Sequence, residues 1–324
     1  MLEMSQEYLA LTPGLNAKEP GAIAALEDLA KRGDPYAQMA LGDLRIAGEG
    51  VTRNFAKGFK LVSKAARQGL LPAMYAEIYL TAKGVGRSAN QELARNMLAR
   101  LAETDRFAAV QHGLLAHATS HETVKQIVPE VISEDPRIVI YRGLFSQAEY
   151  AYLKQTSEPK MAPAMILDPA TGKGRLDPVR RAHEISIPVY EEDLLVQHVL
   201  RTIATATGTG LHYGEPLSIF RYRPGDEYRS HYDAYHKGWT GPQRQKTALI
   251  WLNDAFEGGE TYFNRLDIKV RGQPGDMLVF DNLDANGHRD DRMEHAGLPV
   301  TKGEKWLASR WLLTEDTTKL ERFG

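Results

Sequence analysis

Apolar and small residues recur at helical spacing through the first third of the chain, and each run ends at a glycine. The pattern is clearest over residues 36–51 and 72–85, which align with a period of about 36 residues. Because residues three and four apart share one face of a helix, and glycine favours a helix end, the pattern predicts repeated pairs of helices. The equivalent positions are Gly33 with Gly69, Ala37 with Ala73, and Gly48 with Gly84.

Repeated helix pairs of this kind cannot bury their apolar faces alone, so they stack on their neighbours. A third, more divergent copy over residues 98–118 is expected to close the stack. The region resembles the SEL-like class of tetratricopeptide relatives. This resemblance implies a concave surface that recruits a protein or peptide substrate. The alternative is a helical bundle that packs and has no partner.

The rest of the chain has a different pattern. From Leu217 onward, short alternating runs of apolar residues are separated by glycine and proline turns, which is typical of two packed β-sheets. Pro129 and Pro136 interrupt regular structure between the two halves. The expected fold is therefore α+β with two domains. We expect helical repeats over residues 1–125 and a jelly-roll with flanking helices over residues 126–324.

Composition describes an ordinary globular protein and excludes several classes of function. The 324 residues are 43% hydrophobic and 25% charged, with a formal net charge of −2. No global field therefore favours nucleic acid or an anionic membrane as a partner. No apolar run approaches the roughly 18 residues of a membrane span, and residues 1–7 lack the features of a signal peptide. The chain has no cysteine, so disulfides and thiolate metal sites are excluded, and a cytoplasmic location is expected.

Two histidines and one aspartate give the strongest chemical signal. His231 and Asp233 come shortly after the apolar and aromatic run over residues 217–222, and His295 lies 64 positions after His231. Side chains two apart on a strand point the same way, so the first two can reach one ion. Two imidazoles and a carboxylate on one side of a metal leave its other side open, which suits non-haem Fe(II) chemistry with O₂. His288 and Asp290 have the same spacing, but their polar surroundings predict a solvated loop.

Lys305 is the second chemical signal. It begins a predicted strand over residues 305–313 and shares one face of that strand with Leu307, Ser309 and Trp311. A lysine buried among apolar residues is unfavourable unless it meets a carboxylate. Taken together with His231, Asp233 and His295, this lysine favours a clamp for the carboxylate of an acidic co-substrate. The alternative is a lysine that starts the strand and extends its ammonium group into water.

From about residue 135 onward, the chain resembles the prolyl 4-hydroxylase family of Fe(II)- and 2-oxoglutarate-dependent dioxygenases. The resemblance covers roughly 180 residues, and its blocks follow one another in the family's order. The blocks are residues 136–146, 222–233, 247–253, 257–263, 274–280 and 295–311. The resemblance implies a double-stranded β-helix that holds side chains from separate strands around one ion.

At the matching positions, the resemblance makes His231, Asp233 and His295 the ligands of Fe(II). It makes Lys305 the residue that binds the distal carboxylate of 2-oxoglutarate. The implied oxidant is O₂, and ascorbate is a candidate auxiliary cofactor. The cofactor chemistry performs the difficult step, and the protein positions the reactants and excludes water.

Four further positions match residues around the co-substrate and the substrate. Tyr222 and Thr261 match positions that hydrogen-bond 2-oxoglutarate. Arg244 and Trp311 match positions near the peptide site. The chain has no cysteine, and no secretory leader is expected from residues 1–7. Both features distinguish it from eukaryotic members and argue against a collagen-type substrate.

The expected function is hydroxylation of a residue in a polypeptide, with proline as the expected target. The loop over residues 236–245 contains Gly238, Gly241 and Pro242, which suit a mobile lid over an extended chain. One alternative is hydroxylation of another peptide side chain, a free amino acid or a small metabolite. A further alternative is a scaffold whose repeats bind partners and whose jelly-roll is catalytically silent.

Overall fold

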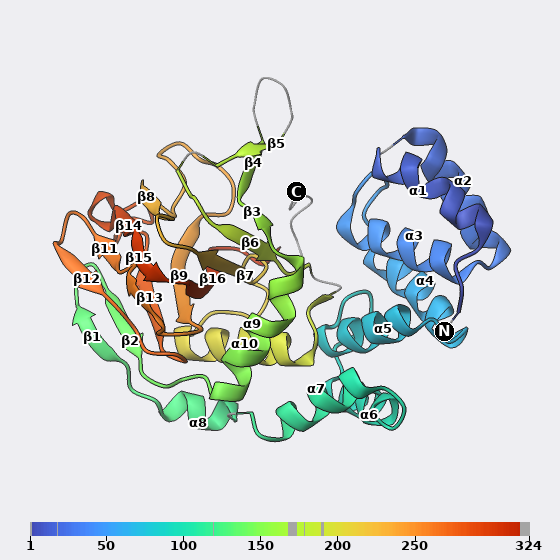
Figure 1. Ribbon diagram of the computed structural model, residues 1–324, viewed down its shortest axis with the longest axis horizontal. Helices are drawn as coiled ribbons and strands as arrows, with labels where there is room; N and C mark the ends of the chain where they lie inside the picture. The colour runs from blue at the N-terminus through green and yellow to red at the C-terminus, as the bar shows by residue number, and fades with distance from the viewer. Residues whose placement is uncertain are drawn as a thin grey trace. The chain divides into compact units, whose positions relative to one another are not determined.

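The computed structural model describes residues 2–17, 19–118, 120–167, 174–177, 179–188 and 191–317 (Figure 1). Its contacts divide the chain into two compact units. The first is built mainly from Met1–His117 and Pro188–Gln197, and the second from Ala118–Ile187 and residues 198–317. Each unit encloses buried apolar clusters of its own, as is usual for separate domains.

Helices α1 to α7 form most of the first unit. Their bounds are α1 (Gln6–Asn16), α2 (Pro20–Arg32), α3 (Pro35–Ala47), α4 (Phe55–Arg67), α5 (Leu71–Lys83), α6 (Gln91–Ala102) and α7 (Arg106–Ala116). The pairs α2–α3, α4–α5 and α6–α7 begin 35 and 36 residues apart. The predicted helical repeat is therefore confirmed. The divergent third copy, expected over residues 98–118, is the pair α6–α7, which begins earlier, at Gln91.

Equivalent residues begin and end the helices of successive repeats. Gly48 and Gly84 end α3 and α5 with φ angles of 78° and 83°, in the left-handed region that glycine adopts without strain. Asn54 and Asn90 precede α4 and α6, and each side chain accepts a hydrogen bond from a backbone N–H three residues further on. Such caps satisfy donors that have no partner within the helix. The residues that begin and end the helices therefore recur with the repeat, as the apolar residues do.

One segment from the second half of the sequence belongs to the first unit. Within Pro188–Gln197, Glu192 forms a buried ion pair with Lys83, and the side-chain amide of Gln197 donates to the carbonyl oxygen of Tyr79 at 2.8 Å. The sequence placed one boundary at residue 125, whereas the contacts place it after His117 and add this segment. Pairing over more than a hundred residues leaves no trace in the local pattern.

Two antiparallel sheets form the second unit. The larger has the strand order β1-β2-β13-β9-β16-β7-β6-β3, and the smaller has the order β12-β11-β14-β8. Two short pairs, β10–β15 and β4–β5, complete the described strands. The bounds are β1 (Glu130–Ser133), β2 (Ile138–Tyr141), β3 (Ala162–Pro163), β4 (Met165–Leu167), β5 (Gly174–Leu176), β6 (His183–Ser186), β7 (Ser218–Tyr222), β8 (Tyr228–His231), β9 (Arg244–Trp251), β10 (Phe256–Gly258), β11 (Thr261–Phe263), β12 (Ile268–Val270), β13 (Met277–Asp281), β14 (His295–Gly297), β15 (Val300–Gly303) and β16 (Lys305–Leu313).

The apolar core lies between the two sheets. Phe263 of the smaller sheet and Phe280 of the larger sheet are both fully buried, and their rings meet edge to face at 5.1 Å between centroids. Trp251 of β9 is also fully buried in this cluster. Two sheets that enclose a shared core in this way confirm the predicted double-stranded β-helix.

Helices cover the outer face of the larger sheet (Figure 1). They are α9 (Gln147–Ser157) and α10 (Leu194–Thr207), while α8 (His121–Gln126) precedes β1 in the chain. Lys154 of α9 lies 5.1 Å from the ring of Trp306, and Arg310 donates to the carbonyl oxygen of Leu200 in α10. Trp306 and Arg310 thus lie on the outer face of β16, so its inner face is free to line a site.

In the described part of the chain, no helix has the length and apolar character needed to cross a membrane.

Two glycines allow the close approach of α3 and α4. A Cβ atom at Gly58 would lie 2.6 Å from Ile46 Cγ1 and 2.8 Å from the carbonyl oxygen of Gly42. We expect Gly58→Ala to lower the free energy of unfolding by about 1–3 kcal/mol, as overpacking does. Gly113→Ala is the control, because a Cβ there meets no atom within 4 Å, and it should be neutral or stabilise by about 0.5–1 kcal/mol. Urea denaturation followed by helical circular dichroism measures both, and equal midpoints would contradict the packing argument.

Candidate active site

Strand pairing in the smaller sheet brings the two predicted histidine ligands together. Strands β8 and β14 are antiparallel neighbours, and His231 lies directly opposite His295 in their register. The two imidazole centroids are 4.3 Å apart. Residues directly opposite on neighbouring strands have adjacent Cβ atoms. Two histidines that lie 64 positions apart in the sequence are therefore direct neighbours across one pair of strands.

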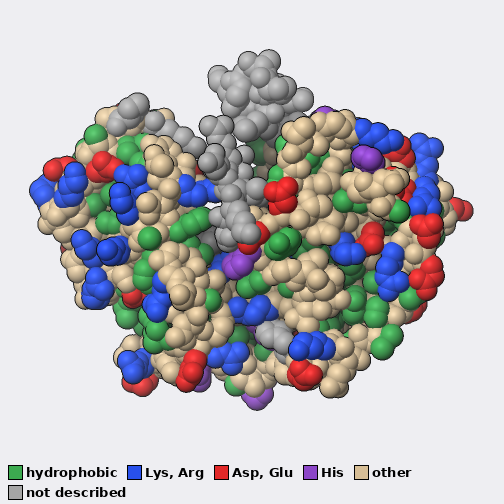
Figure 2. Space-filling view, turned by 180° about the vertical axis from the view of Figure 1, so that it is seen from behind, with side chains coloured by type: hydrophobic (Ala, Val, Ile, Leu, Met, Phe, Trp, Pro, Cys, Tyr) green, Lys and Arg blue, Asp and Glu red, His purple; other side chains and the backbone are tan. Residues whose placement is uncertain are grey.

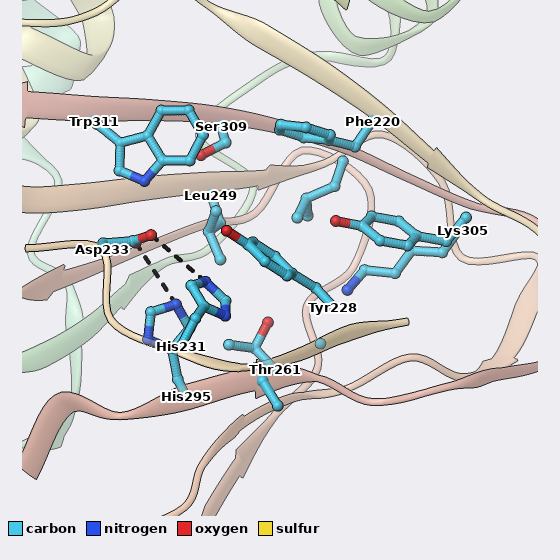
Figure 3. Close-up of a pocket in the computed structure, with 14 residues that line it drawn as sticks. Phe220, Tyr228, His231, Asp233, Leu249, Thr261, His295, Lys305, Ser309 and Trp311 are labelled. Carbon is cyan, nitrogen blue, oxygen red and sulfur yellow. Dashed lines mark ion pairs between the residues drawn. The ribbon is translucent and has the colours of Figure 1, made fainter. Parts of the chain in front are cut away.

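Asp233 completes the cluster from outside the strand. Its Oδ1 lies 3.6 Å from His231 Nε2, and its Oδ2 lies 3.6 Å from His295 Nε2 (Figure 3). Strand β8 ends at His231, so the expectation that His231 and Asp233 share a strand face is wrong. The chain leaves the strand and turns the carboxylate toward both rings. The predicted meeting of the three side chains is nonetheless what the structure shows.

Backbone hydrogen bonds hold both imidazoles in the orientation that a metal requires. Nδ1 of His231 donates to the carbonyl oxygen of Arg229 at 2.7 Å, and Nδ1 of His295 donates to that of Met293 at 2.9 Å. A carbonyl can only accept, so the proton of each neutral ring lies on Nδ1. Each Nε2 then keeps its lone pair and faces Asp233. Such support is usual around metal-binding histidines.

Asp233 is held by a buried polar network that the sequence did not reveal. The Thr247 hydroxyl donates to Asp233 Oδ2 at 2.6 Å, and Asn282 Nδ2 donates to Thr247 Oγ1 at 2.9 Å. Burial by itself would raise the pKa of Asp233, but His295 and His231 hold that pKa well below its usual range. The carboxylate therefore stays ionised. The sequence does show a polar residue in each of two apolar segments, Thr247 in β9 and Asn282 just after β13. It could not show that these residues support a metal ligand, because many buried threonines and asparagines have no such role.

Burial also favours the neutral form of one ligand candidate. It lowers the pKa of His295 to about 4, against the opposing charge of Asp233. A neutral imidazole and an ionised carboxylate are the protonation states that a divalent metal needs. The donor set thus fits Fe(II): two nitrogens and one oxygen converge, and their ligand atoms lie within 4.8 Å of one another.

The competing His-x-Asp pair is not part of this cluster. His288 is exposed, and Asp290 pairs with Arg292 at 2.7 Å. Among the described residues, the only group of three or more such side chains that could hold a metal is His231, Asp233 and His295. Both residues lie in a loop, as predicted, but only His288 is solvated, because Asp290 is buried.

Lys305 lies in the same pocket as the three ligand candidates (Figure 3). Its side chain is buried, and Nζ donates to the carbonyl oxygen of Gly259 at 2.7 Å. The alternative that it reaches water is therefore wrong. Among the described residues, no carboxylate lies within ion-pair distance of the ammonium group. Burial lowers the pKa of Lys305 to about 8, although the charge of Glu260 opposes the shift. A buried cation that only a carbonyl accompanies is suited to an anionic ligand.

Tyr222 and Thr261 surround the same end of the pocket. Tyr222 lies opposite Lys305 in the register of β7 and β16, and the lysine Nζ is 5.5 Å from the tyrosine ring centroid. Thr261 begins β11 and is also buried. Gly259 approaches closely, because a Cβ there would lie 3.2 Å from Lys305 Cδ, and its φ of +69° suits glycine. The cation and two hydroxyl-bearing residues thus gather at one place.

The sequence did not single out Tyr228, which is the aromatic wall of the pocket. Its ring stacks on His231 at 3.5 Å between centroids and lies between the ligand cluster and Lys305 (Figure 3). Side chains leave about 40 Å³ of free space there. Tyr228 lies three residues before His231, which was the available signal, but strand alternation would place the two on opposite faces. A register shift brings them together, because the step from Tyr228 to His231 in β8 is three residues long and lies opposite the two-residue step from Gly297 to His295 in β14.

Arg244 and Trp311 are neighbours, and only Trp311 lines the pocket. Arg244 makes two hydrogen bonds to Glu215, at 2.6 and 2.8 Å, and its guanidinium lies 4.2 Å from the Trp311 ring centroid. Burial would lower the pKa of Arg244, but Glu215 holds it above its usual range. The guanidinium therefore stays charged beside the aromatic ring. The Trp311 Nε1 and Ser309 Oγ atoms are buried without a hydrogen-bond partner among the described residues.

Comparison with known proteins gives one consistent family. Residues 217–313 match the sequence pattern of the 2OG-Fe(II) oxygenase superfamily. The chain is 30% identical over 212 residues to prolyl 4-hydroxylase 1 of Arabidopsis thaliana, covering 60% of this chain and 75% of that protein. It is 31% identical over 201 residues to prolyl 4-hydroxylase 13 of the same plant, covering 56% and 72%. The fold and the site define an Fe(II)- and 2-oxoglutarate-dependent dioxygenase. The chain belongs to the prolyl 4-hydroxylase family.

Solved structures resemble each part of the chain. A viral collagen prolyl hydroxylase from Paramecium bursaria Chlorella virus-1 is 25% identical, with a TM-score of 0.45, covering 55% of this chain and 96% of that one. A Sel1 repeat protein from Oxalobacter formigenes is 31% identical, with a TM-score of 0.27, covering 29% of this chain and 40% of that one.

The polar network behind the ligands gives a test that leaves the ligands themselves intact. Thr247→Val removes the hydroxyl that orients Asp233, and we expect metal affinity to fall about 10–100-fold. His231→Ala or His295→Ala should abolish metal binding. Anaerobic titration with Fe(II), or with Mn(II) as a spectroscopic substitute, measures these affinities. Thr301→Val, at an exposed position of β15, is the control and should change nothing. An unaltered affinity in Thr247→Val would remove the network from the site.

Lys305 gives a test of co-substrate binding and of its pH dependence. We expect Lys305→Ala to weaken 2-oxoglutarate by about a few hundredfold, because breaking a buried pair costs about 3–5 kcal/mol. Metal affinity should change little. Because the ammonium form binds the carboxylate and its pKa is about 8, affinity should be highest below pH 8 and decrease as pH rises above it. Calorimetry with Mn(II) in place of Fe(II) measures both effects.

The exposed Lys302 offers a matched control for Lys305. It lies three residues away and pairs at the surface with Glu257 at 3.0 Å, so Lys302→Ala should leave the affinity for 2-oxoglutarate and its pH profile unchanged. Equal affinities for Lys305→Ala and Lys302→Ala would show that the buried lysine does not contact the co-substrate.

Proposed function

We propose that this protein hydroxylates a prolyl residue in a polypeptide, with consumption of 2-oxoglutarate and O₂ and release of succinate and CO₂. The observation that carries the proposal is one pocket that contains both the His-Asp-His cluster and the buried Lys305. The two similar proteins of Arabidopsis thaliana described above are named prolyl 4-hydroxylases. A silent scaffold is disfavoured, because it has no use for a buried, carboxylate-free lysine beside three assembled ligands.

In this proposal, His231, Asp233 and His295 hold Fe(II) and Lys305 binds the distal carboxylate of 2-oxoglutarate. When bound, the metal supplies the oxidising chemistry that removes hydrogen from an unactivated C–H bond. The protein supplies position. The Nδ1 hydrogen bonds fix both rings, Thr247 fixes the carboxylate, and the Tyr228 ring stacks on one face of His231.

Tyr222 and Thr261 are the proposed hydrogen-bond partners of the co-substrate. Both lie beside Lys305 and line its pocket. Ser309 is an additional candidate, because its Oγ lines the pocket and has no partner among the described residues. The three hydroxyls and one ammonium group could satisfy the oxygens of a dicarboxylate as it leaves water.

Arg244 and Trp311 are the proposed contacts of the peptide. Trp311 presents an aromatic face to the pocket, and Arg244 lies over that ring. Outside the pocket, Trp239 is 46% exposed and stacks on Tyr235 at 4.5 Å. Proline has a preformed extended backbone and an apolar ring, so it binds aromatic surfaces with little loss of conformational entropy. These rings favour a prolyl substrate over a free charged amino acid.

The target is tested by turnover of matched peptides. Proline-containing peptides, and the same peptides with alanine in place of proline, are incubated with the protein, Fe(II), 2-oxoglutarate and ascorbate. We expect only the proline peptides to gain one oxygen, and mass spectrometry should locate it on the proline. Trp239→Ala should raise the KM for the peptide more than it lowers kcat, because the ring lies outside the pocket.

Other outcomes distinguish the alternatives. Oxygen found only on non-prolyl side chains or on free metabolites would overturn the prolyl assignment and leave the oxygenase intact.

A cytoplasmic location is part of the proposal, because a reducing compartment keeps iron as Fe(II). Ascorbate is proposed as an auxiliary reductant, and turnover assays with and without it test that role.

A further inference from the structure

A groove in the helical repeat unit has a strongly positive lining. Helices α2 and α4 both pack against α3, and the groove between them has a volume of about 370 Å³. Five of its lining side chains are basic and one is acidic. The basic residues are Lys31, Arg45, Lys57, Lys60 and Lys64. Figure 2 shows lysine and arginine side chains gathered over the repeat helices, with hydrophobic side chains between them.

The charge of the groove is not neutralised within the described chain. Glu27, the acidic residue, pairs with Arg45 at 2.6 Å. Lys57, Lys60 and Lys64 are exposed, and no carboxylate of the described residues lies within ion-pair distance of any of them. They lie three and four residues apart, so they form one row along α4. Four lysines therefore face the groove with uncompensated charge, although the protein as a whole has a net charge of −2.

The floor of the groove is apolar. Ala30 and Leu41 are buried in the core of α2 and α3, and Leu61 of α4 packs against them while remaining partly exposed. None of the residues that line the groove is aromatic. Proteins that bind single-stranded nucleic acid combine positive charge with aromatic rings on which bases stack. A positive rim over an aliphatic floor instead suits a polypeptide that carries both acidic and apolar side chains.

We propose that this basic groove binds an acidic, extended segment of a partner polypeptide, with glutamate or aspartate on the row of lysines and apolar side chains on the floor. Lys57 and Lys64 are separated by about 10 Å along the helix, at 1.5 Å per residue. An extended chain in the polyproline II conformation has about three residues per turn and rises about 3.1 Å per residue, so side chains three positions apart lie on the same side of it and about 9 Å apart. Acidic residues about three positions apart therefore match the row. The inference goes beyond prolyl hydroxylation, because it concerns a site in the repeat unit with no part in the chemistry.

Binding is measured on the full chain without turnover. The probe is a fluorescein-labelled peptide with glutamate at every third position and leucine or alanine between, and its partner has glutamine in place of glutamate. We expect fluorescence anisotropy to show binding of the glutamate peptide only, with an affinity that falls as salt is added. The variant Lys57→Ala/Lys60→Ala/Lys64→Ala should lose about tenfold or more in affinity, since each exposed pair contributes a modest amount.

A second triple variant controls for overall charge. Arg95, Arg100 and Arg106 are exposed residues of α6 and α7 outside the groove, so replacing all three with alanine removes the same charge. This control should bind the peptide within about twofold of the unaltered protein. Both variants should keep helical circular dichroism and 2-oxoglutarate turnover, which shows that they fold. Failure of prolyl hydroxylation would not affect this assay, because no reaction is measured.

Three results would overturn the proposal. They are absence of binding to the glutamate peptide, an equal loss of affinity in the two triple variants, and tighter binding of another anion. A single-stranded oligonucleotide and vesicles that contain phosphatidylserine are the competing probes. If either binds more tightly than the peptide and loses affinity in the lysine variant, the groove recognises nucleic acid or membrane instead.

Discussion

The register between β8 and β14 is the constraint on which the active site depends. It places His231 opposite His295, and the turn after β8 then adds Asp233 to both. A slip of one residue would move every side chain of a strand to the other face of the sheet. The two rings would then no longer meet. The aromatic residues Phe263 and Phe280 pack against His295 at 5.7 and 4.9 Å between ring centroids, so the apolar core itself holds this register in place.

The dioxygenase unit buries two positive charges on β16, one on each face of the strand, and the two have different hydrogen-bond partners. On the outer face, Arg310 donates hydrogen bonds to carbonyl oxygens near and within α10, which satisfies its guanidinium. On the inner face, Lys305 has one carbonyl partner. Arg310 therefore has a structural role, whereas the ammonium group of Lys305 can still donate hydrogen bonds to a ligand. The same strand joins the packing of the unit to its proposed chemistry.

The helical repeats and the dioxygenase differ in how their sequences encode structure. In the repeats, Gly48, Gly84, Asn54 and Asn90 mark helix ends at constant spacing, and each repeat contacts its neighbours in sequence. Local signals therefore sufficed to predict these elements. In the dioxygenase, strands far apart in sequence pair with one another. The order of the sheets and the role of the segment Pro188–Gln197 could not be obtained from local pattern.

From the sequence by itself, residue type, spacing and the family resemblance predicted the class of fold. They also singled out two histidines, an aspartate and a lysine as candidates to bind a metal and an anion, because few side chains suit either ligand. Only the tertiary structure decided that Asp233 lies beyond its strand, that Thr247 holds it, and that Tyr228 stacks on His231. These contacts join residues on separate elements, and their energy comes from burial and hydrogen bonding in three dimensions. A local pattern of apolar and polar positions contains no information about which distant partners will meet.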